Sequence, residues 1–108
     1  GEPLHHKNLF ATYRLVKWFK NDFPDKTIWI YTGYDFEYLL SLQYSLETSK
    51  FIRPDCFIKT IFYTIDVLVD GKFIEEKKLR LAYRGSINQR IIDVQKSLRE
   101  NKVILYKE

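Results

Sequence analysis

Apolar residues recur at helical spacing in three stretches of the chain. The first stretch predicts a helix over residues 8–21, with Asn8 as its N-cap and the breaker Asn21-Asp22-Phe23-Pro24 at its end. The second predicts a helix capped by Asp35, and the third predicts a short helix around residues 58–65. The apolar positions that define these helices are Leu9, Phe10, Tyr13, Val16 and Phe19, then Phe36, Leu39, Leu40 and Leu46, then Ile58, Ile61, Phe62 and Ile65.

Two short runs have the composition of β-strands. Residues 27–31 are β-branched or aromatic, and Gly33 interrupts the chain soon after them. Residues 66–70 form a continuous apolar run between two aspartates, and Gly71 ends it. An uninterrupted apolar run of this length is typical of a strand that is buried on both faces.

The last third of the chain is less regular. Residues 74–82 predict a charged loop or helical turn, and residues 84–86 predict a turn. We expect a strand over residues 90–93, a helical turn over residues 94–100 and a final strand over residues 103–106.

The order helix, strand, helix, helix, strand is typical of α/β proteins with mostly parallel sheets. A chain of 108 residues fits a single domain, 1–108, and a composition of 45% hydrophobic and 17% aromatic residues excludes disorder as the main state. The apolar runs are much shorter than the ~20 residues of a membrane span. The single cysteine, Cys56, fits a reducing, cytoplasmic setting.

The net charge of +4 comes from 18 basic and 14 acidic residues whose signs interleave. Glu75 and Glu76, for example, stand directly before Lys77 and Lys78. Nucleic-acid-binding segments more often carry blocks of one sign, so the charge pattern gives little support to a polyanionic partner.

Three short motifs stand beside predicted strands: Thr32-Gly33, Asp70-Gly71 and Arg84–Gln89. Each combines a glycine, which allows close approach of the backbone, with groups that form directional hydrogen bonds. If the strands are parallel and adjacent, the three motifs meet at the sheet edge where ligands of α/β proteins bind. Taken singly, each motif is more typical of a tight turn.

Other candidate residues have simpler interpretations. His5 and His6 are adjacent, so on a helix their side chains point about 100° apart and they suit solvated positions better than one shared metal ion. Cys56 has no closely flanking Lys or Arg to stabilise a thiolate, so a place in the core or on a helix face is favoured. Trp18 and Trp29 fit the core or its rim.

The motifs also carry a family resemblance. Gly1-Glu2-Pro3 resembles the end of the Gly-Gly-Glu-Pro motif of radical S-adenosylmethionine enzymes. Residues 29–34 (WIYTGY), 66–73 (DVLVDGKF) and 84–90 (RGSINQR) follow in order. Over essentially its whole length, the chain resembles the activating proteins of anaerobic ribonucleoside-triphosphate reductase.

The resemblance implies the C-terminal part of an incomplete (β/α) radical S-adenosylmethionine barrel. In the full-length family, a 4Fe–4S cluster, supplied with electrons by a donor such as flavodoxin, cleaves S-adenosylmethionine to methionine and a deoxyadenosyl radical. That radical takes a hydrogen atom from a glycine of the reductase and leaves the glycyl radical. The implied partner is therefore the glycyl-radical subunit of the reductase, and neither a nucleic acid nor a membrane is expected as a partner.

The resemblance also assigns residues. Gly1 and Glu2 match the motif that holds the methionine amino group, where a carboxylate accepts from an ammonium. Thr32 and Gly33 match polar contacts to the methionine or ribose part. Asp70 matches an acid near the cofactor at a strand end.

Five further residues of the later motifs receive roles from the resemblance. Asn88 and Gln89 are expected to bond the cofactor's carboxylate or ribose. Arg84, with Lys72 and Arg90, is expected to meet an acidic surface of the reductase, and Arg84 has the methionine carboxylate as an alternative partner.

The chain departs from the family at the cluster. The three-cysteine loop of the family precedes the Gly-Gly-Glu motif, and Cys56 alone cannot replace it. We therefore expect a C-terminal portion that holds no cluster, has no metal ligands and is inactive by itself. Loss of neighbouring strands would expose a sheet edge, so self-association is expected.

Two other classes of function remain open at this stage. One is a non-catalytic α/β module that binds a nucleotide or RNA through the more basic second half of the chain. The other is a protein-docking module. Nucleic-acid binding would weaken steeply with salt, by about 0.9 log unit per phosphate contact per log unit of salt.

Overall fold

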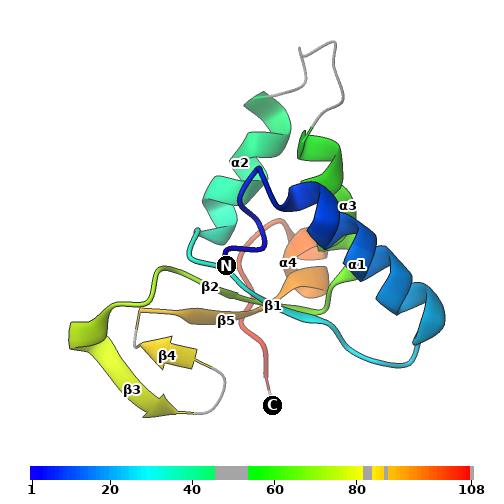
Figure 1. Cartoon of the computed structure of the whole chain (residues 1–108). Coiled ribbons are helices and arrows are strands. Elements are labelled where there is room, and N and C mark those ends of the chain that lie inside the picture. The colour runs from blue at the N-terminus through cyan, green and yellow to red at the C-terminus, as the bar shows by residue number, and fades with distance from the viewer. Residues whose placement is uncertain (46–53, 82–83, 87, 108) are drawn as a thin grey trace.

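The computed structural model describes residues 1–45, 54–81, 84–86 and 88–107 (Figure 1). Leu46, one of the expected apolar positions, lies outside this part. The helices are α1 (Leu9–Asp22), α2 (Phe36–Ser45), α3 (Pro54–Thr64) and α4 (Val94–Glu100), with a 3-10 turn, η1, at Glu75–Lys77. The strands are β1 (Trp29–Tyr31), β2 (Val67–Asp70), β3 (Lys78–Leu81), β4 (Arg84–Ser86) and β5 (Arg90–Asp93).

The main sheet has the strand order β1-β2-β5 and is mixed. β1 pairs parallel with β2, with Ile30 opposite Leu68, whereas β2 pairs antiparallel with β5, with Leu68 opposite Ile92. The prediction of an α/β fold is confirmed, and the prediction of mostly parallel strands is wrong. The physical reason lies in the connections, because a parallel pair needs a crossover such as α2 and α3 provide between β1 and β2. The chain between β2 and β5 makes the β3–β4 hairpin instead and re-enters the sheet where it left.

The helices gather on one side of this sheet, and the hairpin projects from its end (Figure 1). All four residues of β2 are buried, which confirms the strand predicted from the apolar run. The core joins Leu68 of β2 and Ile92 of β5 to the inner faces of α1 and α3. On the sheet, the Trp29 ring packs edge-on against Tyr106 of the C-terminal segment, with centroids 5.2 Å apart.

The ends of α4 and the start of α1 show where capping residues in the sequence do and do not form capping bonds. α4 covers the residues expected for a helical turn, because the Asp93 side chain accepts from the Lys96 amide (3.0 Å) and Asn101 adopts a left-handed conformation at φ 54°. The prediction of Asn8 as a side-chain cap is wrong, since its side chain makes no capping bond and its Nδ2 donates to the Glu2 carbonyl oxygen instead (2.8 Å).

Two expectations for the tail need correction. Residues 84–86 form strand β4, which pairs antiparallel with β3, instead of the expected turn. Within the described residues, the final strand expected over 103–106 is reduced to one bridge, between Ile92 and Leu105. In both cases pairing across the fold decides the structure, and local composition does not report it.

None of the helices in the described part of the chain is long and apolar enough to cross a bilayer.

Candidate functional site

The carboxyl ends of β1 and β2 and the start of β5 meet at one edge of the main sheet. This edge is formed by the strand ends and not by the side of an outer strand. Because β5 is antiparallel to β2, the chain enters β5 at the edge where it leaves β2. The motifs Thr32-Gly33, Asp70-Gly71 and Arg84–Gln89 therefore meet at this edge, as the sequence predicts. The strand direction that brings the third motif there is opposite to the expected one.

An open cavity of about 300 Å³ lies at this edge. Five of the seven residues expected to bind a cofactor line it, namely Gly1, Glu2, Thr32, Gly33 and Gln89. The other two, Asp70 and Asn88, are not among its lining residues. Phe73 and Tyr31 also line the cavity. The sequence reasoning assigned no role to either, although both belong to the motifs that carry the family resemblance.

The Glu2 carboxylate is bonded to the end of β1. Its Oε2 accepts from the Thr32 hydroxyl (2.9 Å) and the Leu4 amide (2.9 Å), and its Oε1 accepts from the Gly33 amide (2.6 Å). We call Glu2, Thr32 and Gly33 the Glu2 corner. A carboxylate offers about four acceptor sites, so one remains after these three bonds.

Residues 32–35 are tied to the end of the neighbouring strand β2. The Thr32 amide donates to the Val69 carbonyl oxygen (2.9 Å), and the Gly71 amide donates to the Tyr34 carbonyl oxygen (3.0 Å). Gly71 has a φ of 96°, a conformation that favours glycine, and a Cβ there would stand 3.4 Å from the Asn88 carbonyl oxygen. These contacts fix the Glu2 corner relative to β2.

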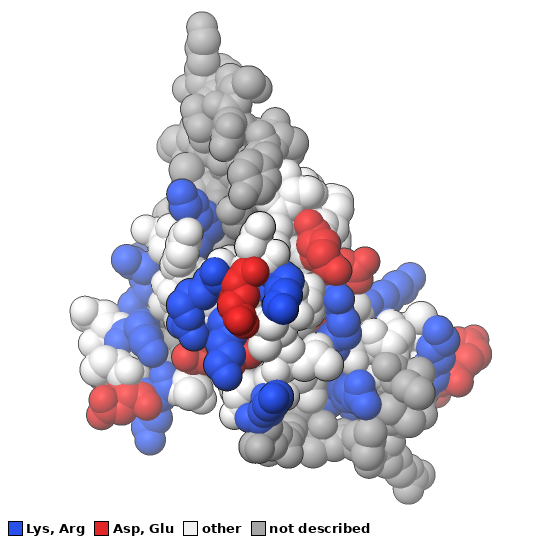
Figure 2. Space-filling model, turned by 180° about the vertical axis from the view of Figure 1, so that it is seen from behind, with Lys and Arg blue, Asp and Glu red and all other residues white. Residues whose placement is uncertain are grey.

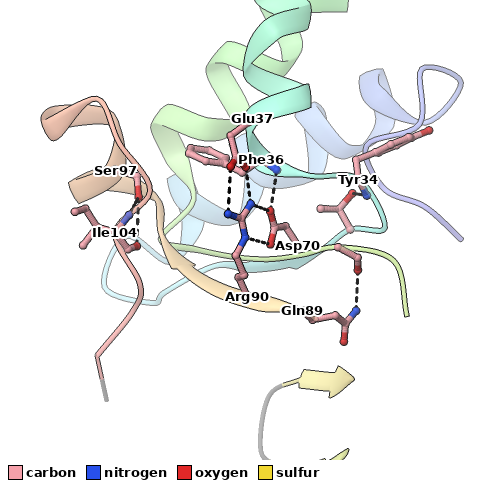
Figure 3. A network of polar contacts seen from close by, with 10 residues as sticks. Tyr34, Phe36, Glu37, Asp70, Gln89, Arg90, Ser97 and Ile104 are labelled. Carbon is pink, nitrogen blue, oxygen red and sulfur yellow. Dashed lines mark hydrogen bonds and ion pairs between the residues drawn. The ribbon is translucent and has the colours of Figure 1, made fainter. Parts of the chain in front are cut away.

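An ion-pair network lies next to this loop (Figure 3). The Asp70 side chain is 1% exposed. It accepts from the Phe36 amide at the start of α2 (2.8 Å) and from both Nε (3.0 Å) and Nη2 of Arg90. The same guanidinium also donates to Glu37 through Nη1 (3.2 Å) and Nη2. Arg90, expected to dock the reductase, thus has two carboxylate partners within the chain.

The pKa values follow these contacts. Hydrogen bonds from Arg90 lower the pKa of Glu37 below its ordinary value. The hydrogen bond to Asp70, followed by that to Glu37, raises the pKa of Arg90. Arg90 therefore stays charged throughout the range in which proteins are folded.

Gln89 joins three segments at the cavity. Its Oε1 accepts from the amides of Gly85 (2.8 Å) and Ser86 (3.1 Å), and its Nε2 donates to the Gly71 carbonyl oxygen (2.9 Å). One amide group therefore fastens the β3–β4 hairpin to the end of β2. A second N–H of Nε2 remains for a further partner.

Asn88 strengthens the same attachment. Its Nδ2 donates to the Lys72 carbonyl oxygen (2.8 Å), and its Oδ1 accepts from the buried Ser86 hydroxyl (2.7 Å). The structure therefore places Asn88 in the support of the hairpin, and a direct contact with a cofactor stays a prediction.

Phe73 forms a wall of the cavity by packing against β4. A Cβ on Gly85 would stand 2.9 Å from Cδ2 of the Phe73 ring, so the ring lies directly on the glycine backbone. Phe73 remains 45% exposed, which leaves part of its ring toward solvent.

The remaining two docking candidates differ in their surroundings. The Lys72 side chain is exposed, whereas the half-buried Arg84 donates through Nη1 to the Gln89 carbonyl oxygen (3.1 Å). Figure 2 shows the face of the molecule that is turned away from the viewer in Figure 1. Basic and acidic side chains are interspersed on this face, in agreement with the interleaved signs in the sequence.

A pH dependence follows from the Glu37 contact. Because its pKa is lowered in the folded state, the ion pair stabilises the protein above the ordinary pKa of 4.5, and this contribution is lost as the pH falls through the lowered value. At pH 7, Glu37→Gln is expected to reduce the free energy of unfolding by about 0.2–1 kcal/mol, a small effect because Glu37 is largely exposed. In urea titrations at several pH values, the difference from the wild type should vanish in acid. A difference that is constant with pH, or equal to that of the exposed control Glu100→Gln, would contradict this.

The match to a known family covers most of the chain. Residues 1–92 match the family model described as a 4Fe-4S single cluster domain. The chain belongs to this family.

The similar proteins share one name, anaerobic ribonucleoside-triphosphate reductase-activating protein. Over 90 residues, the chain is 38% identical to the Pasteurella multocida protein and 41% identical to the Vibrio cholerae protein. Over 91 residues it is 35% identical to that of Enterobacteria phage T4. The resemblance indicated by the motifs is thereby confirmed.

These alignments cover 82%, 82% and 84% of this chain but 49%, 48% and 47% of the respective relatives. The chain thus spans about half the length of the curated relatives it matches. No solved structure matches the chain.

The residues present do not fit an iron–sulfur cluster. Such clusters are held by several cysteine thiolates, and the 108 residues contain only Cys56, whose side chain lies outside the described part. Among the described residues, no three His, Cys, Asp or Glu side chains are grouped so that they could hold a metal ion. The cluster implied by the family name is therefore not assigned to any residue here.

Proposed function

We propose that this chain is the part of a reductase-activating protein that binds S-adenosylmethionine at the Glu2 corner. The whole protein would use this cofactor to create a glycyl radical on anaerobic ribonucleoside-triphosphate reductase. The observation that carries the proposal is the Glu2 carboxylate, which lines the cavity at the strand ends and keeps one acceptor site. The names of the relatives support the choice of partner.

The lining residues fit the chemical groups of S-adenosylmethionine. The Glu2 carboxylate would accept from the ammonium of the methionine part, a charge-assisted bond. The remaining N–H of Gln89 would donate to the cofactor's carboxylate or ribose oxygens. The partly exposed Phe73 ring would offer an apolar wall to a planar group. When bound, the cofactor supplies the chemistry that removes a hydrogen atom from a glycine of the reductase.

The Glu2 assignment predicts a specific loss of binding. Glu2→Gln keeps the shape of the side chain but removes the charge, so the affinity for S-adenosylmethionine should fall by roughly 10–100-fold, the equivalent of one hydrogen bond to a charged group. Isothermal titration calorimetry with the 108-residue chain measures this. Glu100→Gln removes an exposed carboxylate of α4 and should bind as the wild type does. Equal affinities of the Glu2→Gln variant and the wild type would contradict the proposal.

The cluster, the electron donor such as flavodoxin, and the barrel belong to the proposal for the whole protein. We propose that the 108 residues alone make no radical, because they contain one cysteine. Anaerobic reconstitution with iron and sulfide should therefore give no stoichiometric 4Fe–4S absorption band. A band with four irons per chain, retained after gel filtration, would refute this, and a protein that carries a three-cysteine loop is the positive control.

The surroundings of the three basic docking candidates indicate which of them is available to contact the reductase. Lys72 is exposed at the hairpin base, whereas Arg84 and Arg90 both have partners within the chain. We therefore propose Lys72 as the main docking cation, with Arg84 beside it.

A further inference from the structure

We infer that Arg90 is a positioning residue for the Glu2 corner: it clamps Asp70 and Glu37, and through Asp70 it fixes the loop that holds Thr32 and Gly33. The inference rests on the proposed function, because it takes the Glu2 corner as the binding site. It assigns Arg90 a role different from reductase docking.

The first step is the fit between Arg90 and Asp70. Both Asp70 oxygens accept a hydrogen bond from Arg90, one from Nε and one from Nη2 (Figure 3). This side-on fork fixes the orientation of the carboxylate as well as neutralising its charge. Because Asp70 is 1% exposed, water does not compete for these positions.

The second step leads from Asp70 to the start of α2. Asp70 Oδ2 accepts from the Phe36 amide at 2.8 Å, so a carboxylate on β2 satisfies a first-turn N–H that the helix itself leaves open. A negative charge at this end of the helix also interacts favourably with the positive end of the helix dipole. Arg90 also binds Glu37, the next residue of α2. The start of the helix is therefore held by two contacts, one from Asp70 to the Phe36 amide and one from Arg90 to the Glu37 side chain.

The third step leads from α2 back to the Glu2 corner. Only three residues separate Phe36 from Thr32, and the Thr32 amide is bonded to Val69 while the Tyr34 carbonyl oxygen is bonded to Gly71. These two bonds therefore hold the short loop to the end of β2 and to the residue that follows it. Gly33 lies between them, and its amide makes the 2.6 Å bond to Glu2.

The variant Arg90→Lys tests the inference. Lysine keeps the positive charge but is a point charge that cannot bind two carboxylates with a planar fork. We expect hydrogen exchange of the Gly33 amide to accelerate about tenfold more than that of the Asp66 amide, because the disturbance is local. The Asp66 amide, bonded to Ile28 at the other end of the sheet, reports global stability. The Gly33 amide proton should also shift upfield as its bond to Glu2 lengthens.

Two further variants make the test specific. Lys72→Ala removes an exposed cation near the same cavity and should leave both amides unchanged. Glu37→Gln removes only the outer half of the clamp and should change Gly33 in the same direction as Arg90→Lys, but less. This milder variant keeps the buried pair and so keeps the test usable if Arg90→Lys folds poorly.

The outcomes separate the inference from the proposed function. If exchange of Gly33 and Asp66 changes equally in Arg90→Lys, or if neither changes, the positioning role of Arg90 is refuted. If the wild-type chain does not bind S-adenosylmethionine but Gly33 responds as expected, the proposed function fails and the positioning role stands. If the wild type binds, the affinity of Arg90→Lys should fall several-fold, and an unchanged affinity would refute the inference.

Discussion

Replacing Arg90 with methionine is expected to lower the free energy of unfolding by up to about 3–5 kcal/mol, because it removes the partner of the buried Asp70 carboxylate and leaves that charge unpaired in the interior. The charge left behind is that of Asp70, which is 1% exposed and would keep only the Phe36 amide as a partner. Urea denaturation followed by circular dichroism at pH 7 measures the loss.

A second substitution in the same pair serves as the control. In the double variant Arg90→Met with Asp70→Asn, the buried charge is absent, and the asparagine oxygen still accepts from the Phe36 amide. Part of the lost stability should therefore return. A loss below about 1 kcal/mol in Arg90→Met, the size expected for an exposed pair, would show that Asp70 is hydrated and the network is weak.

The second large effect is expected in the helical layer. Phe62 of α3 is 1% exposed, and its ring lies 5.3 Å from that of Phe36 at the start of α2. Phe62→Ala should cost about 3–5 kcal/mol through lost apolar burial and the cavity left behind. Thermal and urea unfolding of the variant measure this.

Phe10→Ala is the matched control for Phe62. Phe10 lies on α1 and is 54% exposed, although it contacts Phe57 with ring centroids 5.4 Å apart. Its loss should be clearly smaller than that of Phe62. If both variants lose the same stability, the packing of α2 on α3 is not what holds the helical layer.

The elements that sequence patterns predict well are those defined by local chemistry. The apolar run of β2 and the helical turn over residues 94–100 both depend on residues close together in the sequence, and both are found where expected. The direction of β5 is not encoded in this way. It follows from the connection between Gly71 and Arg90, whose described residues form a 3-10 turn and the β3–β4 hairpin instead of a crossover helix, and the irregular pattern there gives no sign of the β3–β4 pairing.

The candidate site divides along the same line. The neighbourhood of Glu2, Thr32 and Gly33 was predictable from the motifs and from the rule that ligands bind at strand ends. The pairing of Arg90 with Asp70 and Glu37 was not, because the partners stand 20 and 53 residues away in the sequence. Such long-range pairs leave no periodic signal in the sequence. The sequence therefore does not indicate whether a charged residue in a motif lies at the surface or is buried in an ion pair.

The reversed strand β5 also limits how this sheet can grow. Its outer side is met by the bridge to Leu105, and its direction does not suit a right-handed helical crossover from β2. Among the described strands, β1 has a single neighbour, so a strand added in parallel by a helical connection would join beside β1. Growth of the sheet would therefore take place on the side of β1, the strand whose last residue, Tyr31, lines the cavity.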